Sequence, residues 1–390
     1  MSEPYDAIVV GAGITGASTA YYLKNKGAAR VLLLEKGAGP ACSNTGRSAG
    51  IVRTFYTTPL MTRIAKAAVT LFEGMKGELG RDGGFHQTGF TQIIPPEWVA
   101  QTEKMIAMHQ EAGIGTTIID PSEYEQRLPW LNPEGVGVVV LEGESGYADP
   151  VQTTEAFAEA FTRIGGEARF KTPCRGLLRD GDRVNGVVLE EGAVYAGAIV
   201  NAAGPWAKFL AESIDLELPL RALREQDTIL EVRHHADMPR TPVSNAIEPS
   251  YMRPMGEGRW LLGRGFPKPY FDVDPYNFKE SVDNEFSVEV LEMMTKRVPP
   301  LQGAKILGGY AALYDVTPDW APFFGPRSGL EGYYDACGGS GHAFKTGPIL
   351  ARELAEWILD GSVRDDYRQL SYDRVENDNL FKTTFGGNRQ

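Results

Sequence analysis

Three glycines near the start of the chain have the spacing of a dinucleotide-binding turn. Gly11, Gly13 and Gly16 follow an apolar run over residues 6–10. In turns of this kind the first glycine permits a sharp bend, the second lets a pyrophosphate approach the backbone, and the third lets the new helix pack closely on the strand. We predict that this turn holds two phosphates at a helix N-terminus, with Ile14 and Thr15 beside them.

Glu35 has the position expected of a ribose-binding acid. It lies nineteen residues after Gly16, at the end of a second apolar run over residues 31–34. A carboxylate at this place accepts hydrogen bonds from both hydroxyls of an adenosine ribose. Because strand, glycines, helix, second strand and acid occur in this order, a dinucleotide site explains the segment better than a glycine-rich loop does.

A second glycine-rich segment, residues 338–341, precedes another helical pattern more than 320 residues after the first. A nicotinamide dehydrogenase needs only one nucleotide cleft, whereas a second helix N-terminus could meet the far end of a longer cofactor. A helix beginning between Gly341 and Lys345 would stabilise the negative charge of a two-electron-reduced isoalloxazine ring through its dipole and free N–H groups. The pattern therefore favours a flavin; a nicotinamide-dependent dehydrogenase, which would be colourless, is the alternative.

Composition and charge limit the classes of partner. The chain has 390 residues, a formal net charge of -12 and no run of five or more basic residues, which argues against nucleic acid and an anionic membrane as partners. The glycine turn begins within a dozen residues of Met1, and no apolar run approaches the roughly 20 residues that a bilayer requires, so we expect a cytoplasmic protein. Three widely spaced cysteines, and a His234-His235 pair with no third ligand nearby, predict neither a disulfide nor a metal site.

Hydrophobic periodicity predicts a chain that leaves its nucleotide-binding domain and returns to it. Helical spacing is found at residues 62–79, 153–164 and 285–295, and again after Gly341. Strand signals are found at residues 85–94, with a bend at Gly89, and at 136–141, 168–200, 251–254 and 260–263. A chain of this length with 42% hydrophobic residues can bury more than one core, which predicts two lobes.

Over nearly its whole length the chain resembles the flavin-dependent amine oxidoreductases of the D-amino-acid oxidase superfamily, and the sarcosine oxidase branch in particular. Besides the N-terminal turn, the motifs that carry the resemblance are Tyr147-Ala-Asp-Pro150, Val200-Asn-Ala-Ala-Gly-Pro-Trp206, Thr317-Pro-Asp319 and Gly339-Ser-Gly-His-Ala-Phe-Lys345. The resemblance implies FAD in a two-domain α/β (α+β) fold like that of p-hydroxybenzoate hydroxylase. A Rossmann-like FAD-binding domain would comprise residues 1–84, 145–220 and 316–390, and a discontinuous β-sheet substrate-binding domain residues 85–144 and 221–315.

The resemblance also implies how a substrate is held. In the sarcosine oxidase branch an arginine and a lysine bind the substrate carboxylate over the flavin, and Arg53 and Lys345 match their motifs. Either residue taken alone could instead be a surface or phosphate-pairing cation. Tyr314 and Tyr251 match aromatic residues that border the substrate, with packing in the core as the alternative.

The same resemblance bears on the cofactor. Relatives attach the flavin through a histidine or a cysteine at positions where this chain has Arg47 and Ala312, so noncovalent FAD is predicted, with Arg47 near it. A lysine that assists oxygen in the family's oxidases corresponds to Leu261, which favours a dehydrogenase unless a neighbour such as Arg264 compensates. The predicted cofactor-binding residues are Gly11, Gly13, Ile14, Thr15, Gly16, Glu35, Lys36, Ser43, Arg47, Ser48, Cys174, Ala203, Gly204, Trp206, Gly339, Gly341, His342, Ala343, Phe344 and Lys345.

The implied activity is oxidation of a secondary or tertiary amine that bears a carboxylate. N-methyl or other N-substituted amino acids, which would be demethylated or dealkylated, and cyclic imino acids fit this description. Hydride would pass to flavin N5, the imine would be hydrolysed, and oxygen or another acceptor would take the electrons. Alternatives are an oxidase or dehydrogenase of a primary D-amino acid, glycine or an opine, and a flavin subunit that needs a partner subunit in a heteromeric dehydrogenase.

Overall fold

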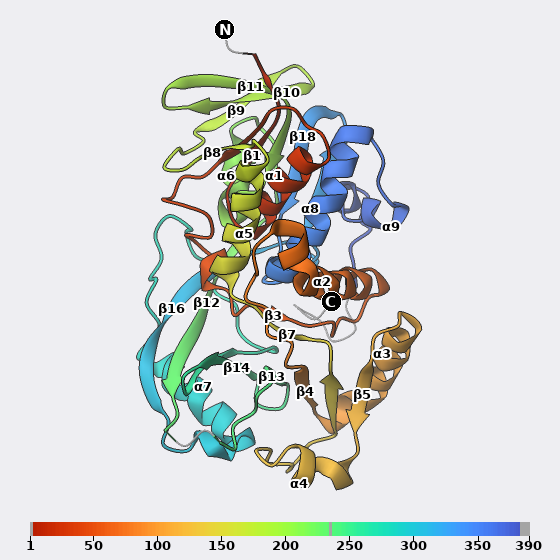
Figure 1. Cartoon of the computed structure of the whole chain (residues 1–390), viewed down its shortest axis with the longest axis vertical. Coiled ribbons are helices and arrows are strands. Elements are labelled where there is room, and N and C mark those ends of the chain that lie inside the picture. The colour runs from red at the N-terminus through yellow and green to blue at the C-terminus, as the bar shows by residue number, and fades with distance from the viewer. Residues whose placement is uncertain (1–2, 234–235, 383–390) are drawn as a thin grey trace.

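The computed structural model describes residues 3–233 and 236–382, and its first large sheet occupies the upper half of the molecule (Figure 1). The strands of this sheet are β1 (Tyr5–Val10), β2 (Val31–Leu34), β8 (Glu167–Arg169), β9 (Gly176–Asp180), β10 (Arg183–Leu189), β11 (Gly192–Asn201), β17 (Phe323–Arg327) and β18 (Leu330–Cys337). Their order is β17–β18–β10–β11–β1–β2–β8, with β9 paired to β10. β1 lies between β2 and β11 and runs parallel to both, as in nucleotide-binding sheets.

Alternate residues of β1 face two different hydrophobic cores. Ala7 and Val9 belong to the core that contains helices α1 (Ile14–Asn25), α2 (Pro59–Leu79), α5 (Pro150–Arg163) and α8 (Ala343–Asp360). Ile8 and Val10 belong to the core on the other face, with Leu210 of α6 (Ala207–Glu212). Because both faces are covered, residues 6–10 are apolar almost throughout rather than alternating with polar residues.

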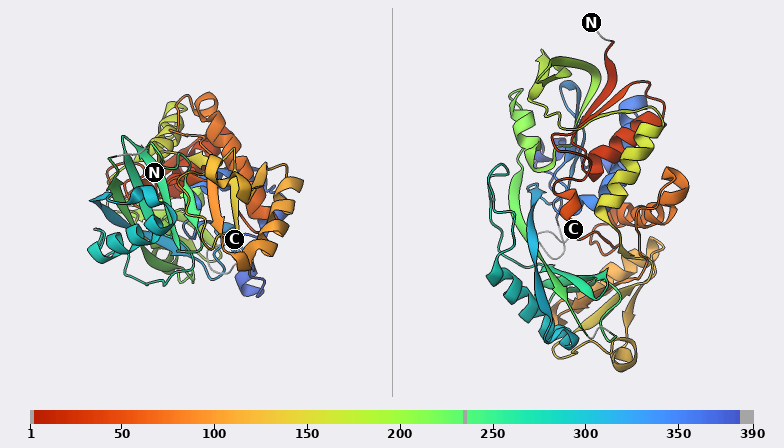
Figure 2. Two further views of the ribbon diagram at one scale, coloured as in Figure 1. Left: turned by 90° about the horizontal axis from the view of Figure 1, so that it is seen from below. Right: turned by 60° about the vertical axis from the view of Figure 1, so that its left-hand side comes forward.

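The second large sheet occupies the lower half of the molecule (Figure 1). Its strands are β4 (Phe90–Ile94), β5 (Thr116–Ile119), β6 (Val138–Glu142), β12 (Arg221–Glu231), β13 (Val243–Asn245), β14 (Ser250–Gly256), β15 (Arg259–Arg264) and β16 (Lys305–Val316), in the order β16–β12–β15–β14–β13–β4–β6–β5. Helix α7 (Asn284–Arg297) covers one face (Figure 2, right). On this face Val290 and Met294 pack with Leu262. The opposite face is therefore free to meet the first domain.

Short elements complete the described part of the chain. Strands β3 (Ile51–Val52) and β7 (Gly146–Tyr147) form a small antiparallel pair between the two sheets. The remaining helices are α3 (Val99–Glu111), α4 (Tyr124–Arg127), α9 (Asp365–Arg368) and α10 (Asp373–Glu376). No helix among residues 3–233 and 236–382 has both the length and the apolar character needed to cross a bilayer. The His234-His235 pair lies outside the described residues.

Strand membership supports our proposed division of the chain into two discontinuous domains. Every strand of the first sheet falls within residues 1–84, 145–220 or 316–390. Every strand of the second falls within residues 85–144 or 221–315, apart from the last residue of β16. The chain thus crosses between the sheets several times, and each crossing brings a loop to the space between them.

Several elements differ by a few residues from the sequence-based ranges, and for two of them the structure gives a physical reason. The strand expected over residues 85–94 begins only at Phe90, because Gly89 adopts a φ of +86° that ends the extended conformation before it. The helix expected over residues 153–164 begins earlier, at Pro150. The Asp149 carboxylate accepts hydrogen bonds from the N–H groups of Val151 and Gln152, both at 2.9 Å, so the Tyr147–Pro150 motif is a capped helix start.

The Thr317-Pro-Asp319 motif anchors the end of the chain. Asp319 is 6% exposed and receives two hydrogen bonds from the Arg374 guanidinium, at 2.8 and 3.0 Å. It also accepts hydrogen bonds from the N–H groups of Ala321 and Phe381. These donors outweigh the effect of burial and lower the pKa of Asp319, so its carboxylate is charged at neutral pH.

Removing this carboxylate is expected to destabilise the protein strongly. In Asp319→Ala the Arg374 charge stays buried without a counter-ion, although it keeps hydrogen bonds to carbonyl oxygens, and a loss of this kind costs about 3–5 kcal/mol in comparable cases. Asp365→Ala, in which an exposed ion pair with Arg368 is lost, is the control and should cost at most about 1 kcal/mol. Urea unfolding at neutral pH measures both. Because the pKa of Asp319 is lower in the folded state, its contribution should vanish as pH falls below its ordinary range; equal midpoints for the two variants would contradict this prediction.

Candidate active site

The turn after β1 has no room for side chains at two of its glycines. Gly11 has a φ of +105°, and a Cβ there would lie 2.5 Å from the carbonyl oxygen of Ala202, at the end of β11. A Cβ on Gly16 would collide with the carbonyl oxygen of Gly11 itself. The turn and helix α1 are therefore packed backbone to backbone. Gly13 is the N-cap of α1, and its neighbour Ile14 donates its N–H to the Thr45 hydroxyl at 3.2 Å.

Glu35 closes the other side of this turn. Its Oε2 accepts a hydrogen bond from the N–H of Ala12 at 2.8 Å, and its Oε1 accepts one from the N–H of Gly37 at 2.7 Å. Each carboxylate oxygen can accept a further hydrogen bond, as a ribose would require. The neighbouring Lys36 lies over the ring of Trp206, with Nζ 3.1 Å from the ring centroid, and its pKa is lowered to about 8 by burial.

One cavity of about 600 Å³ runs from this turn to the second sheet. All of the site residues predicted from the sequence line it except Gly16, which lies behind it between α1 and the turn. The lining residues from the predicted set are Gly11, Gly13, Ile14, Thr15, Glu35, Lys36, Ser43, Arg47, Ser48, Arg53, Cys174, Ala203, Gly204, Trp206, Tyr251, Tyr314, Gly339, Gly341, His342, Ala343, Phe344 and Lys345.

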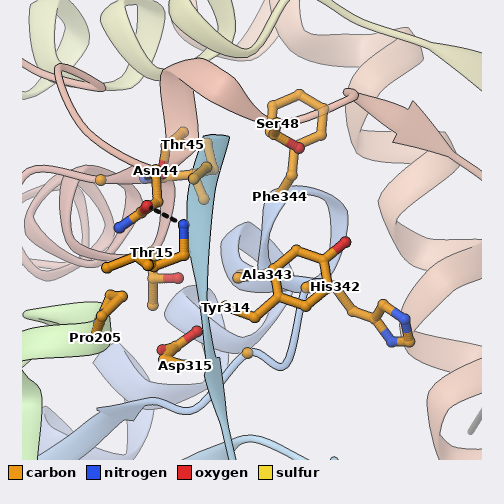
Figure 3. Close-up of a pocket in the computed structure, with 18 of the residues that line it drawn as sticks. Thr15, Asn44, Thr45, Ser48, Pro205, Tyr314, Asp315, His342, Ala343 and Phe344 are labelled. Atoms are coloured by element: carbon orange, nitrogen blue, oxygen red, sulfur yellow. Dashed lines mark hydrogen bonds between the residues drawn. The ribbon is translucent and has the colours of Figure 1, made fainter. Parts of the chain in front are cut away.

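The start of helix α8 forms one wall of the cavity (Figure 3). Its preceding loop is held by Asp315, whose carboxylate accepts the N–H of Gly338 at 2.7 Å and whose carbonyl accepts the N–H of Ser340 at 3.1 Å. Gly341, with a φ of +83°, lies directly against the Tyr314 ring, where a Cβ would have no room. Burial raises the pKa of Asp315 to about 6. The first N–H groups of α8 thus stay available to a bound group.

His342 stands at the N-cap of α8 and carries an unsatisfied polar atom. Its Nδ1 is buried and has no hydrogen-bond partner among the described residues. Its ring meets the Tyr56 ring edge to face, with centroids 5.3 Å apart. Burial, followed by the nearby charges of Lys345 and Arg53, holds the pKa of His342 well below its usual range. The imidazole is therefore neutral and fits a hydrogen-bonding role, as expected from the sequence.

Arg53 and Lys345 converge on one aromatic ring that the sequence had not singled out. The guanidinium carbon of Arg53 lies 4.8 Å from the centroid of Tyr56, and Nζ of Lys345 lies 5.4 Å from it. Lys345 is 5% exposed, and burial followed by the charge of Arg53 holds its pKa well below its usual range. Neither cation forms an ion pair with a described carboxylate. The charge of the buried Glu142 raises the pKa of Lys345 and so partly offsets these effects, but Glu142 forms no ion pair with either of these described cations.

The second sheet adds polar residues to the cavity that the sequence did not reveal. Glu225 and Asp227, two residues apart on β12, both line it, and Lys268 forms an ion pair with Glu225. Tyr251 of β14 donates its hydroxyl hydrogen to Oδ1 of Asp227 at 2.6 Å. The alternation Glu225-x-Asp227 is the one sequence signal that could have placed both acids on the same face of a strand.

The structure also places three residues that the sequence connected with the flavin or with oxygen: Arg47, Leu261 and Arg264. Arg47 lines the cavity, and its guanidinium donates to the Glu280 carboxylate and to the carbonyl oxygen of Ala311, so it also ties the 44–48 segment to β16. Leu261 is fully buried and is not among the lining residues, whereas Arg264 lines the cavity and is paired with Glu289. Within the described ranges, no three His, Cys, Asp or Glu side chains are grouped to hold a metal ion.

The site residues fit FAD on grounds of geometry. Gly11 and Gly13 of the turn line the cavity, and Glu35 beside them keeps acceptor capacity. The cavity continues from there to a second helix start. At that far end the unpartnered Nδ1 of His342 and the first turn of α8 can meet the polar edge of a flavin. A mononucleotide bound at the glycine turn would leave the end of the cavity at α8 unfilled.

Comparisons with known proteins agree with this assignment. A profile described as "FAD dependent oxidoreductase" (DAO) matches residues 6–357. The 4-methylaminobutanoate oxidase (formaldehyde-forming) of Paenarthrobacter nicotinovorans is 27% identical over 91% of this chain, but the chain spans only 44% of that protein's length. Sarcosine oxidase subunit beta of an Arthrobacter species is 25% identical, over 97% of this chain and 93% of its own.

A solved structure extends the likeness to the whole fold. The L-proline dehydrogenase of P. horikoshii superposes with a TM-score of 0.89 at 26% identity, and the match covers 98% of this chain and all of that one. The profile match, the glycine turn and the cavity that joins it to α8 lead to one conclusion. The chain belongs to the FAD-dependent oxidoreductase family of the D-amino-acid oxidase type, with FAD as its cofactor.

Proposed function

We propose that this enzyme oxidises a secondary or tertiary amine that carries a carboxylate, such as an N-methyl amino acid or a cyclic imino acid. The observation that carries the proposal is the pair Arg53 and Lys345, two cations of the cavity wall that have no carboxylate partner. A substrate carboxylate would supply the missing negative charge through charge-assisted hydrogen bonds. Relatives named for 4-methylaminobutanoate, dimethylglycine, sarcosine and proline support this substrate class.

The residues of the chain would act mainly by positioning. The turn at Gly11 and Gly13 would hold the pyrophosphate, Glu35 the ribose, and the N-terminus of α8 the flavin end. When bound, FAD accepts the two electrons and the hydrogen removed from the carbon next to the nitrogen. Arg53 and Lys345 would fix the substrate carboxylate, and Tyr314, packed on Gly341, would border the rest of the substrate.

The electron acceptor and any partner subunit belong to the proposal as well. We propose an acceptor other than oxygen, because the buried Leu261 offers no charge to developing superoxide. The two cavity-lining cations that follow it most closely in the sequence are each paired with a carboxylate, Arg264 with Glu289 and Lys268 with Glu225. The near-complete overlap with a relative named as a subunit supports association with a second chain. Copurification from the source cell, compared with the activity of the isolated chain, tests this.

A substrate panel tests the function directly. The purified flavoprotein would be mixed without oxygen with N-methylglycine, N,N-dimethylglycine, 4-methylaminobutanoate, L-proline, glycine and D-alanine. Loss of the flavin absorbance with an N-substituted or cyclic member, and little loss with glycine or D-alanine, is the expected result. Faster bleaching by the two primary amines would favour the alternative substrate class instead. No bleaching by any member, together with no spectral response to propionate, would refute the proposed function.

We also expect the FAD to be bound without a covalent link. Arg47 and Ala312 offer no nucleophile. The three thiols that line the cavity are the buried Cys337, the half-buried Cys174 and the exposed Cys42, and all have raised pKa values because of desolvation, with the charge of Glu35 adding to the effect at Cys42. A thiol that stays protonated is a poor nucleophile. Precipitation of the protein with acid should therefore release all yellow colour into the supernatant. Colour retained in the pellet would show that a covalent bond exists.

A further inference from the structure

Asp227 lies on the wall of the cavity formed by the second sheet, and the structure keeps one of its oxygens free. Oδ1 accepts the hydrogen bond from the Tyr251 hydroxyl at 2.6 Å. Oδ2 receives no hydrogen bond from the described residues, although Asp227 is 7% exposed and lines the cavity. Gly263 makes this arrangement possible, because a Cβ there would lie on top of both the Tyr251 hydroxyl and Oδ1.

Asp227 faces a mixed set of charged and titratable groups. Its neighbour Glu225 is already neutralised by Lys268, which also donates to the carbonyl oxygen of Arg264 at 3.2 Å. Asp227 is therefore the acid of this wall that has no cation bound to it. The groups that face it from its own and the neighbouring elements are Glu225 on β12, Tyr251 and Arg253 on β14, Tyr310 and Tyr314 on β16, and Lys268 after β15.

Tyr314 connects this wall electrostatically to the proposed carboxylate site. Its pKa is raised well above the usual range by burial and by Glu225 and Asp227, and the charge of Arg53 opposes this rise. The Tyr314 ring projects from β16 toward the start of α8, on the side of the strand opposite to Asp315 (Figure 3). Tyr314 is thus within electrostatic range of both the acids of β12 and the cation Arg53, and all four residues line the same cavity. An amino acid with an ammonium and a carboxylate group requires charges of both signs in its binding site.

We infer that Asp227, oriented by Tyr251, binds the substrate ammonium group and accepts its proton before oxidation. This inference rests on the proposed function. The N–H bond of the ammonium breaks, an O–H bond forms at Oδ2, and no electrons are transferred in this step. The neutral amine that remains has the lone pair needed to stabilise the cation formed when hydride leaves the adjacent carbon. Arg53 and Lys345 would hold the other end of the same substrate.

The pH dependence of flavin bleaching is the measurement that tests Asp227. Burial raises the pKa of Asp227 to about 7, so the carboxylate is ionised above this pH and protonated below it. In the wild-type enzyme the bleaching rate with the best amine of the panel should therefore fall below about pH 7. Asp227→Asn should lack this acid limb and react about 10²-fold or more slowly at pH 8, the usual size of a proton-transfer contribution.

Two further variants test the direction of the pH shift and provide a control. The Tyr251 hydroxyl stabilises the charged form of Asp227, so Tyr251→Phe should move the acid limb to higher pH by about one unit. Asp272→Asn removes an exposed carboxylate that pairs with Arg221 outside the cavity, and its profile should match the wild type. An acid limb that stays in Asp227→Asn, or that moves to lower pH in Tyr251→Phe, would overturn the inference.

Ligand binding separates this inference from a general loss of the pocket. Propionate carries a carboxylate but no amine, and its binding can be followed by the change in flavin absorbance. Asp227→Asn should bind propionate within about twofold of the wild type, because Arg53 and Lys345 are unchanged. Loss of propionate binding in this variant would assign Asp227 a structural role and refute the inference. Failure of every panel amine to bleach the wild-type flavin, together with no spectral response of the wild type to propionate, would instead refute the proposed function.

Discussion

Lys345→Met is expected to raise the Michaelis constant for a carboxylate-bearing amine by about 10- to 150-fold, the worth of one charge-assisted hydrogen bond of about 1.5–3 kcal/mol. Lys345 is 5% exposed and lies in the first turn of α8. Its Nζ lies over the Tyr56 ring at 5.4 Å from the centroid, as the Arg53 guanidinium carbon does at 4.8 Å. Its loss removes one of the two cations available to the substrate carboxylate. The flavin-to-protein ratio should not change, because the glycine turn and Glu35 are intact.

The thermal stability of Lys345→Met provides a second, independent readout. In the absence of substrate, Lys345 is a buried amine with no ion-pair partner, and burial already lowers its pKa strongly. Methionine has a similar length and no charge, so the midpoint of thermal unfolding in the substrate-free enzyme should stay constant or rise. Lys305→Met, at an exposed position at the start of β16, is the matched control and should change neither quantity. An unchanged Michaelis constant in Lys345→Met would exclude the proposed role.

Gly16→Ala should abolish FAD binding. The added Cβ would collide with the carbonyl oxygen of Gly11, and neither partner is a flexible side chain. Helix α1 would have to move away from the turn after β1, and overpacking of this kind costs about 1–3 kcal/mol or more. Because the same turn and helix start hold the pyrophosphate, the displacement acts directly on cofactor affinity. We expect a purified protein with less than about one-tenth of the wild-type flavin content.

A second glycine gives the control for this substitution. Gly77 lies on the exposed side of α2, and a Cβ there would meet no atom within 4 Å. Gly77→Ala should keep full flavin content and gain about 0.5–1 kcal/mol of stability, since alanine is the better helix former. The flavin-to-protein absorbance ratio and urea unfolding measure both variants. A yellow, fully loaded Gly16→Ala protein would refute the assigned role of the turn.

The cofactor-binding elements could be predicted because their signals are local in the sequence. The turn from Gly11 to Gly16 and the loop before α8 each place several constraints within a few residues. Backbone geometry then requires glycine at the positions where a side chain would collide, as the structure shows at Gly11 and Gly341. The family resemblance extended this local information to FAD, and the profile match confirms it.

The chain alone thus determined the nucleotide turn, the preference for a flavin and the presence of two lobes, which follow from residue type and spacing, and the family resemblance added FAD and the two-domain fold. The tertiary structure decided which distant residues meet. Lys345 reaches the same Tyr56 ring as Arg53 only because helix packing brings the start of α8 to it. Asp227 meets Tyr251 only because β12, β15 and β14 pair in this order. Strand order and register depend on contacts over the whole domain, so residues that share a wall of the cavity leave no common pattern in the sequence.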